Sequence, residues 1–403
     1  MADDIRFEVI KKIADTRFKY KDLGKVSQIS SSSPPSVFIG SKLRYPTVNV
    51  GILSPLERDE DAWVYDAAEF WAKNNFGIRD VINLRESLLN SRFQTRVTDP
   101  RTKQGKFTQM AQDIATASRP VDLEIELKSR VGPGFKRDRV VLPQGMHAPL
   151  KKAVITGNVK VDSKLDKMMN DDVKATEAVD FLYTNNFSEY TLSKILSVGV
   201  LGMRKDRKLV PTRWSITATD DMIGKRLLDS IRSYRWLENY EFFFGEFMGN
   251  CYLILLFPNI FSYELFELYL PGSSWNPGKE IKASTDMENF YGRKSYASNT
   301  AGGYYAARLP ILEYLESVKR QASVIAIRIE LPTYWAALGV WVVRESVKKA
   351  MANRKFEFTD MKELLESVKK VSMIKFGYDP GKLFKKSKVL EGIKTQTTLG
   401  KWF

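Results

Sequence analysis

A single cysteine, Cys251, is the feature that most narrows the folds open to this chain of 403 residues. One thiol can form neither a disulfide framework nor a zinc site of clustered thiolates, so buried apolar side chains must hold the fold together. Cys251 begins the run CYLILLF, which predicts a buried structural thiol. The only histidine, His147, lies between two prolines in LPQGMHAPL, and we interpret it as a polar loop residue. We therefore expect no zinc, and any metal would need carboxylate ligands, as Mg²⁺ does.

Length and charge indicate the class of protein. The chain exceeds one typical hydrophobic core, so two or three domains are expected. Hydrophobic residues make up 43% and charged residues 28%, as in a globular protein. The formal net charge of +15 favours polyanionic partners, nucleic acid first and an anionic membrane surface second.

Nothing in the sequence indicates a membrane protein or an exported one. The first residues, MADDIRFEVIKK, are charged at once, which argues against a signal peptide. The most apolar stretch is interrupted by Pro258 and carries Glu264 and Glu267, so it predicts buried core and not a membrane span. We expect a cytoplasmic protein without a membrane partner.

Hydrophobic periodicity predicts an α+β fold, in which mixed sheets combine with several amphipathic helices. Strand order cannot be derived. Strands are expected within residues 36–55, 121–141, 241–270 and 323–331. Helices are expected within residues 60–93, 171–197, 304–322, 341–354 and 359–371, the last with Thr359 as N-cap. TRWSITATDD predicts a short strand that leads into a helix starting near Asp220.

The first cluster with a chemical signal is MRKDRKLVPTRW. A basic loop beside a tryptophan suits phosphate contacts and base stacking. Its candidate residues are Arg204, Lys205, Arg207, Lys208, Arg213 and Trp214. Asp220 and Asp221 follow, and two carboxylates near cations are weak candidates for a catalytic Mg²⁺ site. The alternatives are a solvated loop and ordinary helix capping.

The second cluster lies in YGRKSYASNTAGGYYAARL. Gly302 and Gly303 precede a helix whose N-terminal amides suit a phosphate, and Arg293, Lys294 and Arg308 add cations. The spacing matches neither the dinucleotide fingerprint nor the GxxxxGK[ST] loop. The alternative is that the glycines permit close packing. A bound nucleotide therefore stays open as a cofactor.

A third basic segment, SRVGPGFKRDR, predicts a hairpin tip that could enter a nucleic-acid groove, although most such tips are simply exposed turns. Its cations are Arg130, Lys136, Arg137 and Arg139.

The last residues carry the most specific motif. Residues 381–403 hold six lysines and one acid, Glu391, which predicts a flexible basic tail. The tail ends in QTTLGKWF, where Leu399, Trp402 and Phe403 fall on one face of a tight helical turn and Gln396 lies at the rim. This pattern matches the motif by which proteins bind the sliding clamp PCNA.

The body of the sequence resembles the archaeal Nre family of DNA repair proteins. The resemblance rests on SPPSVFIGSKLRYPTVNVGILSP, RKLVPTRWSITATDD and TAGGYYAARLPILEYL, and it covers nearly the whole chain from about Ser31. It implies a role in tolerance of DNA damage and recruitment by the sliding clamp. It also implies an N-terminal homology region over residues 31–300 and a C-terminal one over residues 301–380, before the tail at 381–403. Many relatives carry a cysteine-rich zinc motif near the N-terminus, and residues 1–30 lack it here.

Two hypotheses follow. In the first, the protein is a DNA-binding repair factor held at DNA by the clamp. In the second, it is an enzyme that acts on DNA or on a nucleotide-containing lesion through a phosphate pocket formed by residues 207–221 and 292–308, with or without a divalent metal.

Overall fold

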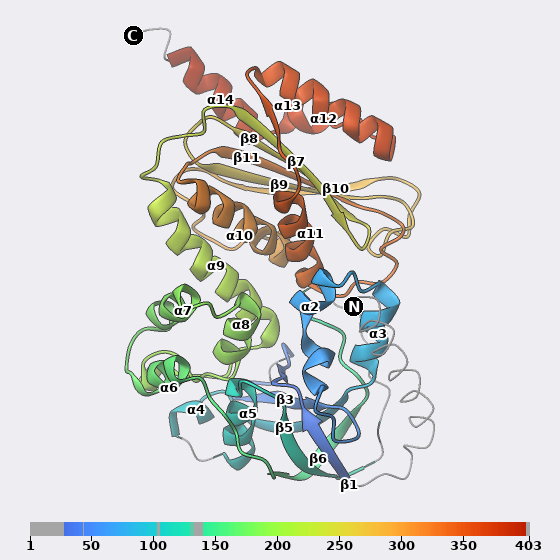
Figure 1. The fold of residues 1–403 in the computed structure, drawn as a ribbon, viewed down its shortest axis with the longest axis vertical. Helices are drawn as coiled ribbons and strands as arrows, with labels where there is room; N and C mark the ends of the chain where they lie inside the picture. Colours follow the sequence, from blue (N-terminus) through green and yellow to red (C-terminus); the bar gives the residue numbers. More distant parts are fainter. Residues whose placement is uncertain (1–27, 43, 103–104, 130, 132–139, 400–403) are drawn as a thin grey trace. The chain divides into compact units, whose positions relative to one another are not determined.

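The computed structural model describes residues 28–42, 44–102, 105–129, 131 and 140–399, with the side chains of residues 396–399 left out. The chain divides into two compact units, Met1–Ile223 and Gly224–Phe403. Each unit contains a mixed six-stranded sheet with helices packed against it, which confirms the predicted α+β class (Figure 1).

The sheet of the first unit has the strand order β1-β5-β6-β4-β3-β2, and neighbouring strands are antiparallel except for the parallel pair β4 and β6. Buried and more exposed residues alternate along β5, as expected for a sheet with one face in the core. In sheet order the strands are β1 Gln28–Ser33, β5 Val121–Leu127, β6 His147–Ile155, β4 Leu89–Arg96, β3 Thr47–Ser54 and β2 Val37–Ile39.

The helices before α9 are short, whereas α9 has 20 residues and contains the boundary between the two units. In chain order they are η2 Ala62–Asp66, α2 Ala68–Lys73, α3 Ile78–Glu86, α4 Asp99–Thr102, α5 Lys106–Thr116, α6 Ser163–Asn170, α7 Ala175–Thr184, α8 Glu189–Ser197, η3 Arg204–Asp206 and α9 Thr212–Ile231.

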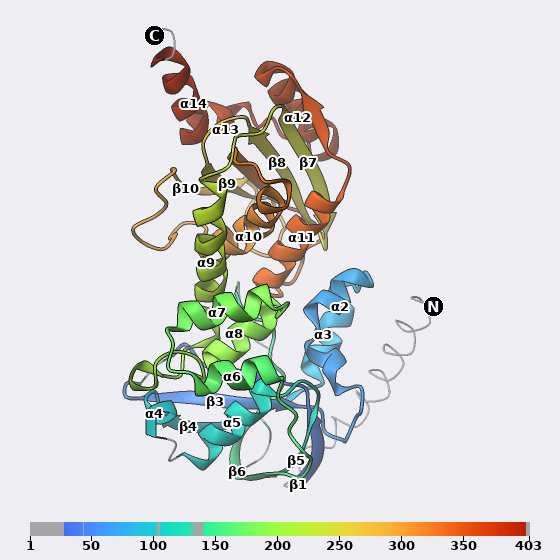
Figure 2. The ribbon, with the colours of Figure 1, turned by 60° about the vertical axis from the view of Figure 1, so that its left-hand side comes forward.

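The sheet of the second unit has the order β10-β9-β11-β8-β7-β12, with β9 and β11 parallel. Its strands are β10 Lys282–Glu288, β9 Ser262–Tyr269, β11 Ser323–Glu330, β8 Asn250–Phe257, β7 Tyr240–Phe247 and β12 Phe356–Phe358. Helices α10 (Ala301–Val318) and α11 (Val340–Ala352) lie on one face. Helices α12 (Met361–Phe376), α13 (Gly381–Lys386) and α14 (Lys388–Leu399) lie on the other (Figures 1 and 2).

Coverage of both faces explains why the central strands are buried on both sides. Every residue of β8 and β11 is buried. Cys251, in β8, is fully buried, and burial, followed by the nearby Glu246, raises the pKa of its thiol. The prediction of a buried structural thiol is confirmed.

Several predicted elements are wrong. Residues 212–219 are not a strand, because α9 already begins at Thr212. The fully buried residues Ser215, Thr219 and Ile223 recur every four positions, which is the helical period and outweighs the strand preference of the β-branched residues here. Asp220 therefore lies inside the helix and not at its start.

Three further predictions need correction. The helix predicted to reach Phe93 ends at Glu86, and β4 follows it. His147 begins β6 instead of lying in a loop, and it pairs with Asn90. The N-cap of α12 is Asp360 and not Thr359, because the Asp360 carboxylate accepts hydrogen bonds from two amides of the first turn.

The segment predicted to be a flexible tail from residue 381 begins as folded structure. Leu383 and Phe384 of α13 and Val389 and Leu390 of α14 are buried against the second sheet. Apolar residues spaced along this lysine-rich stretch outweigh its charge, because the lysines point to solvent while the apolar side chains enter the core. A tail in the predicted sense can start only beyond these residues.

No helix in the described part of the chain is both long and apolar enough to cross a membrane. The predicted hairpin tip, with Arg130, Lys136, Arg137 and Arg139, lies outside the described residues.

Candidate nucleic-acid interface

The first basic cluster lies on a backbone segment that is held from both sides. The amide of Leu209 donates to the carbonyl of Val97 at 2.9 Å, and the amide of Val210 donates to the carbonyl of Ser197 at 2.8 Å. The Ser197 hydroxyl donates back to the Val210 carbonyl at 2.7 Å. The loop that precedes α9 is therefore a fixed support for its side chains.

The cations of this loop divide into two groups. Arg204, Lys205 and Lys208 are exposed. Arg207 is buried, and its guanidinium donates to the carbonyl of Gly202 and to that of Met169, each at 2.8 Å. Arg207 therefore ties the loop to the end of α6. Arg204 also donates from Nη2 to the Asn170 carbonyl at 3.5 Å, but it remains exposed, as do Lys205 and Lys208.

Trp214 and Arg213 lie in the first turn of α9. The Trp214 amide donates to the carbonyl of Pro211 at 2.8 Å, which starts the helix. The Trp214 side chain is 52% exposed, and Arg213 is half-buried. An indole that is half open to solvent, a few residues after three exposed cations, has the composition of a surface that contacts phosphates and stacks on bases.

The two carboxylates proposed as a metal site are in the protein interior. Asp220 and Asp221 are 1% and 5% exposed and lie within α9. Among the described residues, no group of three or more His, Cys, Asp or Glu side chains could hold a metal ion. The geometry therefore gives no support to Mg²⁺ chemistry at this position.

The second cluster surrounds the N-terminus of α10, where carboxylates are already present. Asp286 of β10 accepts hydrogen bonds from the amides of Asn299 and Thr300 at 2.8 and 2.7 Å. Gly302 and Gly303 do not precede the helix as predicted, because α10 already begins at Ala301. At Gly303, an added β-carbon would come within 2.8 Å of the Glu267 carboxylate. The glycine thus permits close approach of a side chain from the sheet, as in the alternative interpretation that the glycines serve packing and not phosphate binding. The helix dipole there faces two acids.

The cations of the second cluster are mostly engaged inside the protein. Arg308 is 2% exposed, and its Nη1 donates to both oxygens of Glu288 at 2.8 and 2.9 Å. Arg293 forms an ion pair with Asp286 at 3.3 Å. Lys294 is exposed. Of these three cations, Lys294 is the one most open to a polyanion.

A buried polar layer between the second sheet and α10 was not predicted from the sequence. Arg328 donates to Glu267 at 2.7 Å, to Glu330 at 2.9 Å and to Asn250 at 2.6 Å. Burial acts to lower the pKa of Arg328, but the two glutamates raise it well above its ordinary value. The alternation in SVIAIRIEL places Arg328 and Glu330 on one strand face, and this charged pair in an apolar run was the available signal.

Three tyrosines of the same unit bury hydroxyl groups that have no hydrogen-bond partner among the described residues. They are Tyr252, Tyr263 and Tyr304. The rings of Tyr263 and Tyr304 meet edge to face with centroids 4.9 Å apart. Burial, followed by the charge of Glu288, raises the pKa of Tyr304 well above its ordinary value. These groups contribute to the polar layer rather than to an open site.

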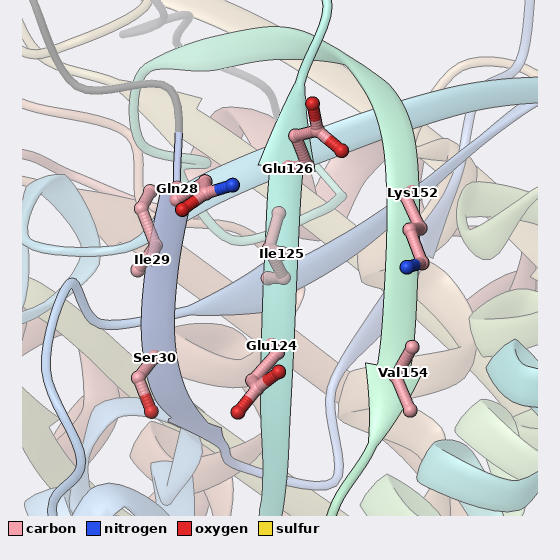
Figure 3. Close-up of a pocket in the computed structure, with 8 residues that line it drawn as sticks. All are labelled: Gln28, Ile29, Ser30, Glu124, Ile125, Glu126, Lys152 and Val154. Carbon is pink, nitrogen blue, oxygen red and sulfur yellow. The ribbon is translucent and has the colours of Figure 1, made fainter.

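A shallow pocket lies over β1, β5 and β6 in the first unit (Figure 3). Its charged residues are Glu124, Glu126 and Lys152, and Glu126 also pairs with Lys151 at 2.6 Å. None of the residues proposed from the sequence lines this pocket. Its two acids make it a poor phosphate site.

The clamp motif is only partly within the described residues. The backbone of Gln396 and Leu399 continues α14, while Trp402 and Phe403 lie outside. The first half of the motif, from Gln396 to Leu399, is therefore helical.

Comparisons with known proteins give one consistent result. A family model described as archaeal Nre, N-terminal, matches residues 2–276, and one described as archaeal Nre, C-terminal, matches residues 288–402. The DNA repair protein NreA of Archaeoglobus fulgidus is 39% identical over 351 residues, which are 86% of this chain and 87% of that protein. The DNA repair protein NreA of Haloferax volcanii is 34% identical over 377 residues, 92% of this chain and 89% of that protein.

A third relative is the DNA repair protein NreB of Archaeoglobus fulgidus, which is 32% identical over 370 residues, 92% of this chain and 90% of that protein. No solved structure matches the chain.

Proposed function

The chain belongs to the archaeal Nre family, and we propose that it is a cytoplasmic DNA repair protein that the sliding clamp PCNA recruits to DNA. The observation that carries the repair role is the similarity, over most of the chain, to three proteins that are named DNA repair proteins. Recruitment by the clamp rests on the C-terminal motif with Gln396, Leu399, Trp402 and Phe403.

The geometry of the C-terminus supports recruitment by a partner. Leu390 is buried against the second sheet, and α14 continues from it for nine further residues to Leu399. A helix rises about 1.5 Å per residue, so Gln396, the first residue of the motif, lies about 9 Å along the helix from Leu390 and about 4.5 Å from the half-buried Ile393, which also packs against the core. A peptide displayed in this way suits insertion of aromatic anchors into a hydrophobic pocket of a second protein.

We further propose that the protein binds DNA through the exposed cations Arg204, Lys205 and Lys208, with Trp214 beside them. Their fixed backbone and their separation from the buried Arg207 support this assignment. The formal net charge of +15 supports a polyanionic partner. Phosphate contacts of this kind make the affinity fall steeply as the salt concentration rises.

Calorimetric titration of the full chain with the sliding clamp of its host tests recruitment. We expect a dissociation constant of about micromolar or lower, corresponding to roughly −8 kcal/mol. The double variant Trp402→Ala/Phe403→Ala should abolish binding. Lys401→Ala should keep it, because Lys401 lies between Leu399 and Trp402 in the sequence and is not one of the apolar anchors. Binding that survives loss of both aromatics would show that the motif is not the contact.

Fluorescence anisotropy with a labelled duplex at several salt concentrations tests DNA binding. The triple variant Arg204→Ala/Lys205→Ala/Lys208→Ala should bind more weakly and show a smaller salt slope, by about 0.9 for each lost phosphate contact. The control is Lys152→Ala/Lys160→Ala/Lys164→Ala, which removes three exposed cations of the same unit. An equal loss of DNA affinity in both variants would show that net charge alone, and not this loop, determines binding.

The alternative is an enzyme with a phosphate pocket. No described feature favours it: Asp220 and Asp221 are buried within α9, and Asp286 and Glu267 lie at the N-terminus of α10. We therefore assign no reaction.

A further inference from the structure

The connection from β10 to α10 presents an unusually open aromatic side chain. We call residues 289–299, with the sequence NFYGRKSYASN, the tyrosine loop. Within it, Tyr291 is 88% exposed, the largest value for a big hydrophobic side chain in the described part of the chain. Tyr296 is 57% exposed. Two rings on one short loop face solvent, so the reason for their exposure has to be sought in a partner.

The backbone around Tyr291 is closed into a tight turn. The Gly292 amide donates to the Asn289 carbonyl at 2.9 Å, and the Tyr291 amide donates to the Asn289 side chain at 3.0 Å. Gly292 has φ of +81°, a conformation that glycine adopts without strain. The tip of the loop is therefore built to hold Tyr291 outward.

Arg232 fixes Phe290, the residue that precedes Tyr291. Its Nε donates to the Phe290 carbonyl at 2.8 Å, and its guanidinium lies 5.6 Å from the centre of the Phe290 ring. Phe290 meets the Tyr291 ring edge to face at 5.6 Å. The Phe290 ring is thus held by Arg232 and contacts the Tyr291 ring, while the Tyr291 ring remains exposed to solvent.

Arg293 holds the two sides of the loop together. It donates to the Met287 carbonyl at 2.7 Å and to the Ser295 carbonyl at 3.1 Å, and its guanidinium lies 5.4 Å from the centre of the Tyr304 ring. Together with its ion pair to Asp286, these contacts make Arg293 an organiser of the loop. The exposed cation of the loop is Lys294.

The second ring is also supported from below. Tyr296 contacts Tyr305 of α10 edge to face, with ring centroids 5.4 Å apart. The Tyr305 hydroxyl accepts a hydrogen bond from the Ala297 amide at 2.9 Å. The loop therefore offers two supported aromatic rings that flank Lys294, and it contains two cations and no acid.

We propose that the tyrosine loop is a stacking platform for unpaired bases of single-stranded DNA. Rings that are held in place lose little entropy when a base stacks on them, and an exposed cation between them in the sequence suits the phosphate of the same strand. Because Arg293 is paired with Asp286, the exposed charge of the loop is that of Lys294, and it favours a nucleic acid over a neutral apolar peptide. This inference rests on the proposed DNA binding, and it adds which form of DNA the second unit would contact and through which residues.

Fluorescence anisotropy of the full chain with three labelled oligonucleotides tests the proposal. The first is a single strand, the second is the same strand with abasic sites, and the third is the corresponding duplex. The wild type should bind the intact strand more tightly than the abasic one. Tyr291→Ala should weaken binding of the intact strand by about 5- to 150-fold, the range typical for loss of one stacked base. It should leave duplex binding unchanged and abolish the difference between intact and abasic strands.

Two variants control for structure and for general loss of a surface tyrosine. Tyr291→Phe keeps the ring and should bind like the wild type. Tyr45→Ala removes another highly exposed tyrosine, 79% exposed and in the first unit, and should have no effect. Lys294→Ala should weaken binding of intact and abasic strands alike, because it removes a phosphate contact.

Several outcomes would overturn the inference. Tyr291→Ala that still distinguishes intact from abasic strands would exclude stacking at this residue, and an equal loss in Tyr45→Ala would make the effect unspecific. Tighter binding of RNA of the same sequence, lost in Tyr291→Ala, would overturn the assignment to DNA. If the wild type binds no DNA at low salt, the proposed DNA binding fails as well, whereas wild-type binding that is insensitive to Tyr291 removes the platform alone.

Discussion

The carboxylate of Glu264 in β9 accepts a hydrogen bond from the hydroxyl of Ser387 at 2.5 Å, 123 positions later in the chain. The same carboxylate accepts hydrogen bonds from the amides of Lys388 and Val389 at 3.3 and 3.2 Å. A buried side chain of the sheet therefore caps the N-terminus of α14, where the helix dipole favours a negative charge. This contact fixes the helix that leads to the C-terminal motif.

The first prediction concerns this cap. Glu264→Gln should lower the free energy of unfolding by about 1.5–3 kcal/mol, because hydrogen bonds to a buried charged acceptor are replaced by weaker ones to a neutral amide. Amide hydrogen exchange at Lys388 and Val389 should speed up first. Glu391→Gln, which changes an exposed acid of the same helix, serves as the control. Unchanged protection at Val389 would show that Glu264 does not hold α14.

The second prediction separates two glycines that lie inside helices. Gly303→Ala should destabilise the protein, since the new methyl group would lie 2.8 Å from the Glu267 carboxylate. Overpacking of this kind costs about 1–3 kcal/mol. Gly392→Ala in α14 meets nothing within 4 Å and should stabilise the helix by about 0.5–1 kcal/mol. Denaturant titration measures both, and the same sign for both changes would contradict the packing at Gly303.

The third prediction tests the division of the basic loop. Arg207→Ala should lower the free energy of unfolding by about 2–4 kcal/mol, because the carbonyls of Gly202 and Met169 lose a charged donor. Lys208→Ala should change it by less than about 0.5 kcal/mol, since Lys208 is exposed. Thermal unfolding provides the comparison. If Lys208→Ala proved as destabilising as Arg207→Ala, Lys208 would belong to the structural group.

The fourth prediction concerns buried tyrosine hydroxyls. Tyr263→Phe should raise the free energy of unfolding by about 1 kcal/mol, because it removes a buried hydroxyl without a hydrogen-bond partner. Tyr314→Phe should lower it, since the Tyr314 hydroxyl donates to Glu241 at 2.6 Å. A loss of stability in Tyr263→Phe would mean that ordered water satisfies its hydroxyl.

The fifth prediction is the response to alkaline pH. Burial raises the pKa of Tyr263, with Tyr252 and Glu288 adding to the shift against the opposing charge of Arg308. The native state therefore keeps a phenolic proton that the unfolded chain loses above about pH 10, so the free energy of unfolding falls as the pH rises through that value.

Denaturant titrations between about pH 9 and 11 check this expectation, together with the ultraviolet absorbance of phenolate. The slope of unfolding free energy against pH should be smaller in Tyr263→Phe. An equal slope in the variant and the wild type would mean that Tyr263 ionises in the native protein as it does in the unfolded chain.

The sequence alone determined those features that depend on local pattern. The apolar composition of residues 241–270 predicted buried strands, and β8 is buried along its whole length. The alternation in SVIAIRIEL predicted a strand, which is β11, but not the burial of every one of its residues. The resemblance to the Nre family rested on three sequence segments, which can be compared without knowledge of the fold. Periodicity and motifs can be recognised without the tertiary structure, because they depend only on residues that are close in the sequence.

Which charged residues are structural and which are open to a partner follows from packing between segments that are distant in the chain. Arg207 and Lys208 are adjacent in the chain, yet one is buried against carbonyl oxygens and the other is exposed. The same holds for the C-terminus, where Glu264 and the core beneath α14 turn an apparently loose basic segment into folded helices. The physical reason is that burial and hydrogen-bond partners come from residues distant in sequence, and no local pattern contains them.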